Sequence, residues 1–81
     1  MRVLAYTVLY EAQPEGGYTV HVPALPGCVT EGDTMDEARR MATDAIRAYC
    51  ESLVEDGEAL PPDVSEPPRH ERLEVVLTPG K

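Results

Sequence analysis

The spacing of apolar positions along the chain changes once, between residues 23 and 35. Before it, residues 2–12 and 18–23 are rich in β-branched and aromatic side chains, many of them in the two-residue alternation of strands. After it, apolar positions recur every three or four residues from Met35 to about Asp56, the spacing of a helix with one apolar face. Alternation returns at residues 73–78. The pattern predicts strands, then one helix, then a final strand.

Glycine and proline residues separate the predicted strands. Gly16-Gly17 can adopt the positive φ angles of a tight hairpin turn, so residues 18–23 are expected to run antiparallel to residues 2–12. Pro23 and Pro26 lack the N–H that a central strand needs, and Gly27 lets the backbone bend after Pro26. A third, short strand is therefore expected at about residues 28–31, before Gly32.

The predicted helix has clear start and stop signals. Thr34 and Glu37 have the spacing of a capping box, in which each side chain accepts a hydrogen bond from a backbone N–H of the first turn. Gly57 suits the left-handed conformation that ends a helix. The predicted apolar stripe, expected to pack on the sheet, consists of Ala38, Met41, Ala42, Ala45, Ile46, Tyr49 and Leu53.

Residues 58–72 contain two Pro-Pro pairs and no apolar period, which predicts an extended loop. A right-handed crossover through the helix would place the final strand, residues 73–78, beside the first strand and parallel to it. The predicted fold is a single α+β domain over residues 1–81, of order β-β-β-α-β. Its mixed sheet has the strand order 3-2-1-4 and one helix on one face.

The first strand is apolar on both faces, although one helix covers only one face of a sheet. The uncovered face is therefore expected to contact another copy of the chain, as a dimer or tetramer. A chain of 81 residues also leaves a large share of its surface exposed when it folds alone. The residues expected at this interface are Leu4, Tyr6, Val8, Tyr10 and His21.

Charge narrows the class of partner. Fifteen acidic and seven basic side chains give a formal net charge of −8, which opposes direct binding of nucleic acid and favours a basic protein as partner. No apolar run is long enough to span a membrane, and no secretion leader is recognisable, so a cytoplasmic protein is expected. Cys28 and Cys50 are expected to be reduced structural thiols, since they form no C-x-x-C pair.

No common catalytic arrangement is found in the sequence. His21 and His70 have no Cys, Ser or acidic neighbour at the spacing of a triad or zinc site. Asp33, Asp36 and Glu37 could bind a metal ion as in a nuclease, but capping of the helix explains them more simply. We expect a protein that is not an enzyme and has no cofactor, metal or small-molecule substrate.

Residues 16–38 resemble the HicB family, the antitoxin-like partners of small HicA ribonucleases. The motif positions that the chain matches are Tyr18, Val20, Pro23, Leu25, Pro26, Gly27, Cys28, Thr30, Gly32, Asp33, Thr34, Glu37 and Ala38. The resemblance implies a partial ribonuclease H-like sheet, and a protein that inhibits a basic HicA-like toxin by covering its RNA-binding and active surface. Full-length HicB antitoxins usually carry a DNA-binding module after this domain, and a short form without that module is expected here.

Acidic residues are the candidates for contact with such a toxin. They lie at the hairpin, before the helix and in the proline-rich loop: Glu11, Glu15, Glu31, Asp33, Glu58, Asp63 and Glu66. Two alternatives remain open at this point. One is an orphan structural or regulatory homo-oligomer without a toxin. The other is a metal-dependent ribonuclease H-like nuclease, which the absence of any acid before Glu11 in the first strand disfavours.

Overall fold

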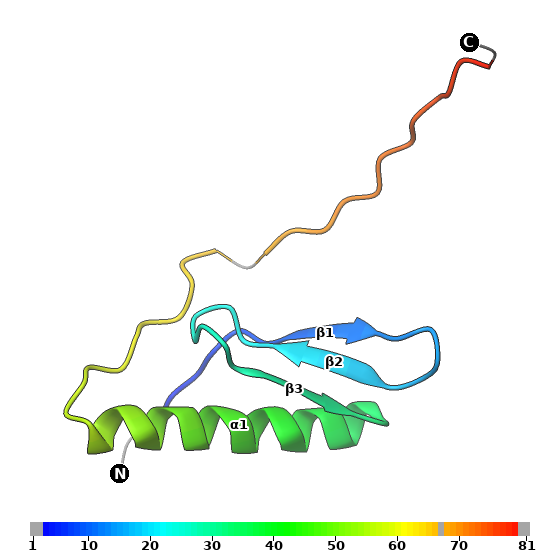
Figure 1. Ribbon diagram of the computed structural model, residues 1–81. Helices are drawn as coiled ribbons and strands as arrows, with labels where there is room; N and C mark the ends of the chain where they lie inside the picture. The colour runs from blue at the N-terminus through cyan, green and yellow to red at the C-terminus, as the bar shows by residue number, and fades with distance from the viewer. Residues whose placement is uncertain (1–2, 67, 80–81) are drawn as a thin grey trace.

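The computed structural model describes residues 3–66 and 68–79. It contains a three-stranded antiparallel sheet, β1 (Leu9–Ala12), β2 (Tyr18–His21) and β3 (Val29–Gly32), followed by one long helix, α1 (Met35–Glu55). Figure 1 shows the sheet lying along α1, with the C-terminal residues leaving this body as an extended tail. The tail gives the chain its length of 62 Å against 27 and 19 Å in the other directions.

The hairpin between β1 and β2 forms as the sequence predicts. Gly16 and Gly17 have φ angles of +105° and +84°, and the Gln13 N–H donates to the Gly17 carbonyl at 3.0 Å. This turn sets a register in which Leu9 lies opposite His21 and Ala12 lies opposite Tyr18. The alternation of residues 18–21 then directs Val20 to the buried side, where its side chain is fully covered.

A compact turn joins β2 to β3. Val22 donates to the Cys28 carbonyl at 3.1 Å, and Gly27 has a φ angle of +81°, as its place after Pro26 predicts. Leu25 points inward from this turn and is completely buried. The turn thus closes one end of the core while it reverses the chain.

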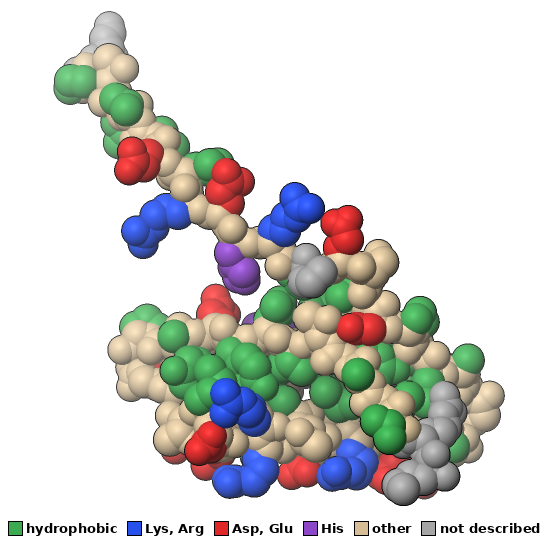
Figure 2. Space-filling view, turned by 180° about the vertical axis from the view of Figure 1, so that it is seen from behind, with side chains coloured by type: hydrophobic (Ala, Val, Ile, Leu, Met, Phe, Trp, Pro, Cys, Tyr) green, Lys and Arg blue, Asp and Glu red, His purple; other side chains and the backbone are tan. Residues whose placement is uncertain are grey.

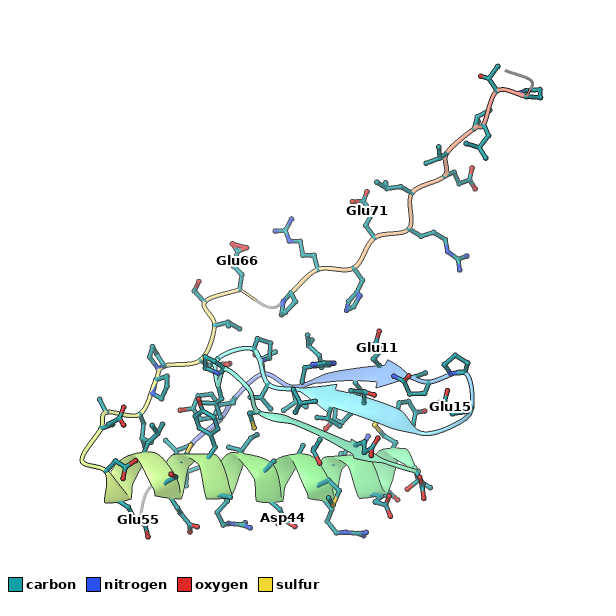
Figure 3. All side chains as sticks on the ribbon, viewed as in Figure 1. Glu11, Glu15, Asp44, Glu55, Glu66 and Glu71 are labelled. Atoms are coloured by element: carbon teal, nitrogen blue, oxygen red, sulfur yellow. The ribbon has the colours of Figure 1, made fainter. Side chains whose placement is uncertain are left out.

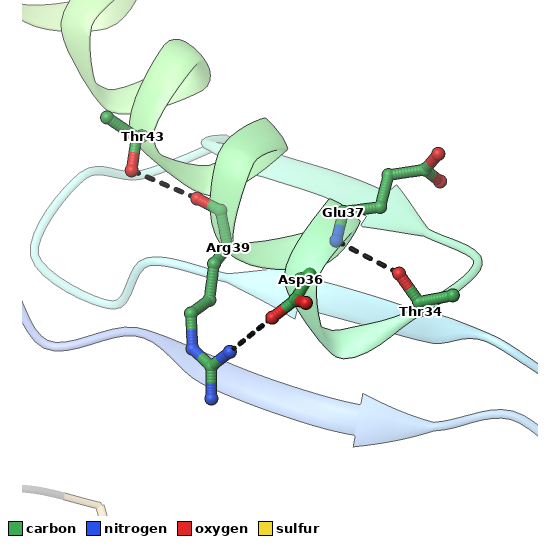
Figure 4. A network of polar contacts seen from close by, with 5 residues as sticks. All are labelled: Thr34, Asp36, Glu37, Arg39 and Thr43. Atoms are coloured by element: carbon green, nitrogen blue, oxygen red, sulfur yellow. Dashed lines mark hydrogen bonds and ion pairs between the residues drawn. The ribbon is translucent and has the colours of Figure 1, made fainter.

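The start of α1 is capped by Thr34, which accepts a hydrogen bond from the Glu37 N–H at 3.1 Å (Figure 4). The Glu37 carboxylate accepts in return from the Asp33 N–H at 2.7 Å, one residue earlier than a standard capping box would place it. Asp36 pairs with Arg39 in the same turn at 3.0 Å. These contacts fix the direction in which the helix leaves β3.

The other end of α1 has the double hydrogen bond of a Schellman motif. Gly57 donates to the Val54 carbonyl and Glu58 to the Leu53 carbonyl, at 3.0 and 2.9 Å. Gly57 has the predicted left-handed conformation, with a φ angle of +72°. The predicted helix boundaries are therefore confirmed to within one residue.

The core between sheet and helix depends on small residues. Ala38 and Ala42 pack on Val20, and a second cluster joins Cys50 to Leu25 and its neighbours. At the closest point, a Cβ added to Gly32 would lie 2.5 Å from the Ala38 nitrogen. Glycine at position 32 therefore allows β3 and the first turn of α1 to touch. Met41 of the predicted stripe is 40% exposed and lies outside this core.

The prediction of a first strand over residues 2–12 is wrong in its length. β1 begins only at Leu9, residues 3–8 have no regular structure, and residue 2 lies outside the described residues. β2 ends at His21, which lies opposite Leu9, so β2 does not extend far enough to pair with residues 3–8.

The predicted final strand is not observed. Residues 73–78 form no strand in the structure, so the sheet has the order β1-β2-β3 and lacks the fourth position of the order 3-2-1-4. Leu73, Val75 and Leu77 are 71–84% exposed on the tail. An isolated extended segment cannot satisfy its own backbone groups, and here no described residue lies beside it. The α+β class is confirmed, but a ribonuclease H-like arrangement is not confirmed by a three-stranded sheet.

Candidate functional site

The two faces of the sheet differ in chemistry. The register places Tyr10, Val20 and Thr30 in one row, and Val20 packs against α1. The neighbouring rows point away from the helix. These rows contain Leu9, His21 and Val29, and then Glu11, Thr19 and Glu31. The face away from α1, called the open face here, therefore carries both apolar and acidic side chains.

The structure corrects the faces assigned to the first strand. Tyr6, Val8 and Tyr10 are half-buried against the core clusters beneath the sheet, and Leu4 lies beside helix residues. The even-numbered residues therefore face α1. Only His21 of the five predicted interface residues belongs to the open face. An alternating strand that is apolar on both sides does not reveal which side the helix covers.

Four of the predicted partner-binding acids share one end of the sheet. Glu11 and Glu31 flank Thr19 on the open face, and Glu15 lies in the hairpin turn. Gly17 of that turn lies against the chain at Gly32 and Asp33, which brings Asp33 to the same end. Figure 3 shows Glu11 on the side of the sheet away from α1, and Glu15 at the hairpin. We call Glu11, Glu15, Glu31 and Asp33 the acidic end.

The acidic end has little basic charge near it. Glu11 lies 3.7 Å from the Nε2 atom of His21, an ion pair when the imidazole is protonated. No other ion pair involves these four carboxylates among the described residues. On α1, in contrast, Arg39 pairs with Asp36 and Arg47 with Asp44, at 3.0 and 3.1 Å. The negative charge at the hairpin end is thus left available to a basic partner.

The remaining predicted acids lie on the segment after α1 and do not join the acidic end. Glu58 is exposed directly after the helix, and Glu66 pairs with Arg69 at 3.6 Å. Asp63 is held within the chain, because it accepts hydrogen bonds from the N–H and the hydroxyl of Thr7 at 2.9 and 2.8 Å. The Thr7 N–H lowers the pKa of this carboxyl, and the hydroxyl adds to the effect.

Nothing in the sequence pattern indicated the contacts between residues 6–7 and 61–63. The Tyr6 hydroxyl donates to the Pro61 carbonyl at 2.6 Å, close to the Thr7–Asp63 pair. The segment that leaves α1 is therefore tied to the segment that enters β1. We call these three hydrogen bonds the clasp. A Thr and an Asp fifty-six residues apart have no shared periodicity, so only their meeting in space identifies them.

The groups weighed for metal binding are engaged in the helix cap. Glu37 accepts from the Asp33 N–H, and Asp36 pairs with Arg39. Within residues 3–66 and 68–79, no group of three or more His, Cys, Asp or Glu residues could hold a metal ion. Cys28 and Cys50 are buried free thiols, as expected, and burial raises the pKa of Cys28. In the same part of the chain, no helix is long and apolar enough to cross a membrane.

Comparison with known proteins gives a consistent family. A family model described as a HicB-like antitoxin of a bacterial toxin–antitoxin system matches residues 6–72. A UPF0150 protein of Thermoplasma acidophilum is 48% identical over 63 residues, which cover 78% of this chain and 91% of that protein.

Relatives with the name antitoxin HicB are longer proteins. Antitoxin HicB 1 of Photorhabdus laumondii is 43% identical over 58 residues, which cover 72% of this chain and 37% of that protein. Antitoxin HicB of Escherichia coli K12 is 36% identical over 58 residues, which cover 72% of this chain and 42% of that protein. The chain thus spans less than half of each of these two antitoxins.

Proposed function

The chain belongs to the HicB-like antitoxin family, and on this premise we propose that it neutralises a small basic ribonuclease of the HicA type. In this proposal the protein covers the RNA-binding and active surface of the toxin and does not act on RNA itself. The observation that carries the proposal is the acidic end, whose exposed carboxylates lie together without Lys or Arg partners among the described residues. A surface that binds RNA phosphates is basic, and such an acidic surface is complementary to it.

The geometry of the acidic end supports a contact surface for a protein better than a catalytic one. Glu11 on β1 and Glu31 on β3 lie on either side of Thr19 of β2, and Leu9 and Val29 lie in the adjacent row. Val29 is 54% exposed. Apolar side chains beside charged ones give a partner both buried area and electrostatic orientation. We therefore propose that the toxin contacts the open face at its hairpin end.

Charge and size also bear on nucleic-acid binding and on self-association. With a net charge of −8, this chain would bind neither DNA nor RNA directly. It would act in the cytoplasm, without cofactor or small-molecule substrate. It would also associate with itself as a dimer or tetramer, which would shelter apolar surface that one small domain leaves exposed.

The proposed contact can be tested by changing the charge of the acidic end. The double variant Glu11→Lys/Glu31→Lys should slow association with a basic HicA-like protein by about tenfold or more, since steering by charge contributes this much to encounter rates. The matched control is Asp44→Lys/Glu55→Lys, which makes the same change of charge on α1. Figure 3 shows Asp44 and Glu55 on the far side of the helix from the sheet.

Stopped-flow or surface plasmon resonance measurements at two salt concentrations would separate the outcomes. A rate that falls only for the sheet variant, and that depends less on salt afterwards, would support the proposed surface. Equal effects of both variants would show that net charge alone matters, and would contradict the surface. Absence of a basic neighbour, together with no binding to any HicA-like protein, would favour the orphan oligomer.

A further inference from the structure

The unpaired edge of β1 and the apolar tail have complementary properties. Among the described residues, β1 pairs only with β2, so one edge of the sheet is free on its other side. The Gln13–Gly17 hydrogen bond sets the alternation of the ladder, in which Leu9 and Glu11 point their N–H groups toward β2. The N–H groups of Tyr10 and Ala12 therefore point to the free edge, where no described strand accepts them.

An open groove lies beneath this edge. It is lined by Val8, which precedes β1, by Tyr10 of β1, and by Ala42 and Ile46 of α1. A continuation of the groove runs past Leu4 toward Val54, which is 58% exposed. Figure 2 shows hydrophobic side chains gathered on the body on this rear side, with the tail leading away from it. An exposed apolar edge of this kind promotes pairing with another strand.

The tail contains a strand of the right length to fill the groove. Residues 73–78 would span about 20 Å as a strand. The groove follows α1 from Arg39 to Val54, and this part of the helix rises about 22 Å. Leu73, Val75 and Leu77 alternate, and together they would present one apolar face to Ala42 and Ile46.

The clasp directs this strand away from the groove of its own chain. If residues 3–8 continue the alternation of β1, the Thr7 N–H points to the β2 side, where Asp63 accepts it. The tail is thus anchored to residues 3–8 on their β2 side, which is opposite to the free edge. The ten residues after Asp63 can span about 33 Å. Figure 1 shows that the tail is extended and points away from the body.

We propose that residues 73–78 of each chain add as a fourth strand to the free β1 edge of a second copy. The exchanged strand would extend the ladder over residues 3–12 and place its Leu73, Val75 and Leu77 side chains on the groove of the partner. Residues 3–8, which form no strand in the described structure, would then join this ladder. The inference rests on the self-association part of the proposed function, but not on the toxin.

The test compares a tail variant with a matched proline variant of the same full chain. Val75→Pro removes an N–H and fixes φ in the middle of the proposed strand, whereas Glu71→Pro makes a similar change before it. Both residues are exposed on the tail, so both variants should keep the helix content of the native protein. Sedimentation velocity would give the assembly, and hydrogen exchange would report on residues 3–12.

We expect the native protein and Glu71→Pro to form a dimer or a larger assembly, with exchange at residues 3–12 that slows as the protein concentration rises. Val75→Pro should shift to monomer and lose this protection. A native monomer at micromolar concentration would overturn both the self-association and the exchange. An assembly that survives Val75→Pro would overturn the exchange alone. Protection that does not depend on concentration would show that the tail pairs with its own chain, and would also overturn it.

Discussion

Asp63 accepts two hydrogen bonds from Thr7, one from the backbone N–H at 2.9 Å and one from the hydroxyl at 2.8 Å. With the bond from Tyr6 to the Pro61 carbonyl, this pair ties the start of the tail to the chain that enters the sheet. The pair is exposed, so its effect is local and does not extend to the whole domain. The Thr7–Asp63 pair fixes the position from which the tail leaves the body.

Removal of the clasp should free the segment after α1 without unfolding the body. In Asp63→Ala, amide hydrogens of residues 6–8 and 58–66 should exchange faster, because two of the three hydrogen bonds of the clasp, those from Thr7, are lost. Amides within α1 should keep their protection. Glu58→Ala is the control, since Glu58 is an exposed acid nearby that makes no side-chain hydrogen bond in the described chain. Equal exchange in the two variants would argue against the clasp.

The clasp should also respond to acid. The folded-state pKa of Asp63 lies below its ordinary value of 3.8, because the Thr7 N–H and hydroxyl stabilise the carboxylate. A group with a lowered folded pKa stabilises the folded form above its unfolded pKa, and this contribution is lost as the pH falls through the folded pKa. The clasp should therefore persist at neutral pH and be lost below pH 3.8. The chemical shift of the Thr7 amide, followed by NMR from pH 6 to pH 2, should show this titration, and Asp63→Asn should abolish it.

Gly32→Ala should destabilise the whole domain. The added Cβ would lie 2.5 Å from the Ala38 nitrogen and 2.7 Å from its Cα, and neither backbone atom can move without shifting α1 from the sheet. Overpacking of this kind costs about 1–3 kcal/mol of unfolding free energy. Urea unfolding followed by circular dichroism would measure it. In Gly57→Asn, the new residue tolerates the left-handed conformation and meets open space, so stability should change much less.

The two thiols should react slowly in the folded protein. Burial raises the pKa of Cys28, and the nearby Cys50 raises it further, so little thiolate forms at neutral pH. Both side chains are buried in the same cluster with Val22 and Leu25. Ellman's reagent at pH 7 should label both cysteines far more slowly in the native protein than in urea. Fast native labelling of Cys28 would contradict its place in the core.

The local signals of the sequence identified most of the body. Glycines at positions 16, 17, 27 and 57 and the N-cap Thr34 each act on a few neighbouring residues and adopt the predicted roles. Glu37 also caps the helix, but it accepts from the Asp33 N–H, one residue before the predicted partner. Long-range pairing was harder to predict. Residues 73–78 have the alternation of a strand, but the strand with which they pair depends on which sheet edge the tail can reach. The local sequence pattern does not encode this edge.

The sequence identified the four residues of the acidic end as candidate contacts, but it did not show that they lie at the same end of the sheet. Glu11, Glu15, Glu31 and Asp33 come from three separate stretches, and the hairpin register together with the contact of Gly17 with Gly32 brings them to one end. Asp63 appeared equivalent to them in the sequence and is instead engaged by Thr7. The helix-facing side of the first segment was also assigned wrongly, since apolar residues on both faces give no indication of the covered one.

We propose that this protein acts by binding a toxin. Titration of a basic HicA-like protein with increasing amounts of this chain, followed by RNA cleavage, tests this proposal. Cleavage should fall steadily and stop near equal numbers of the two chains, while this chain alone should leave the RNA intact. Cleavage that continues unchanged in excess of this chain would show that it does not neutralise such a toxin.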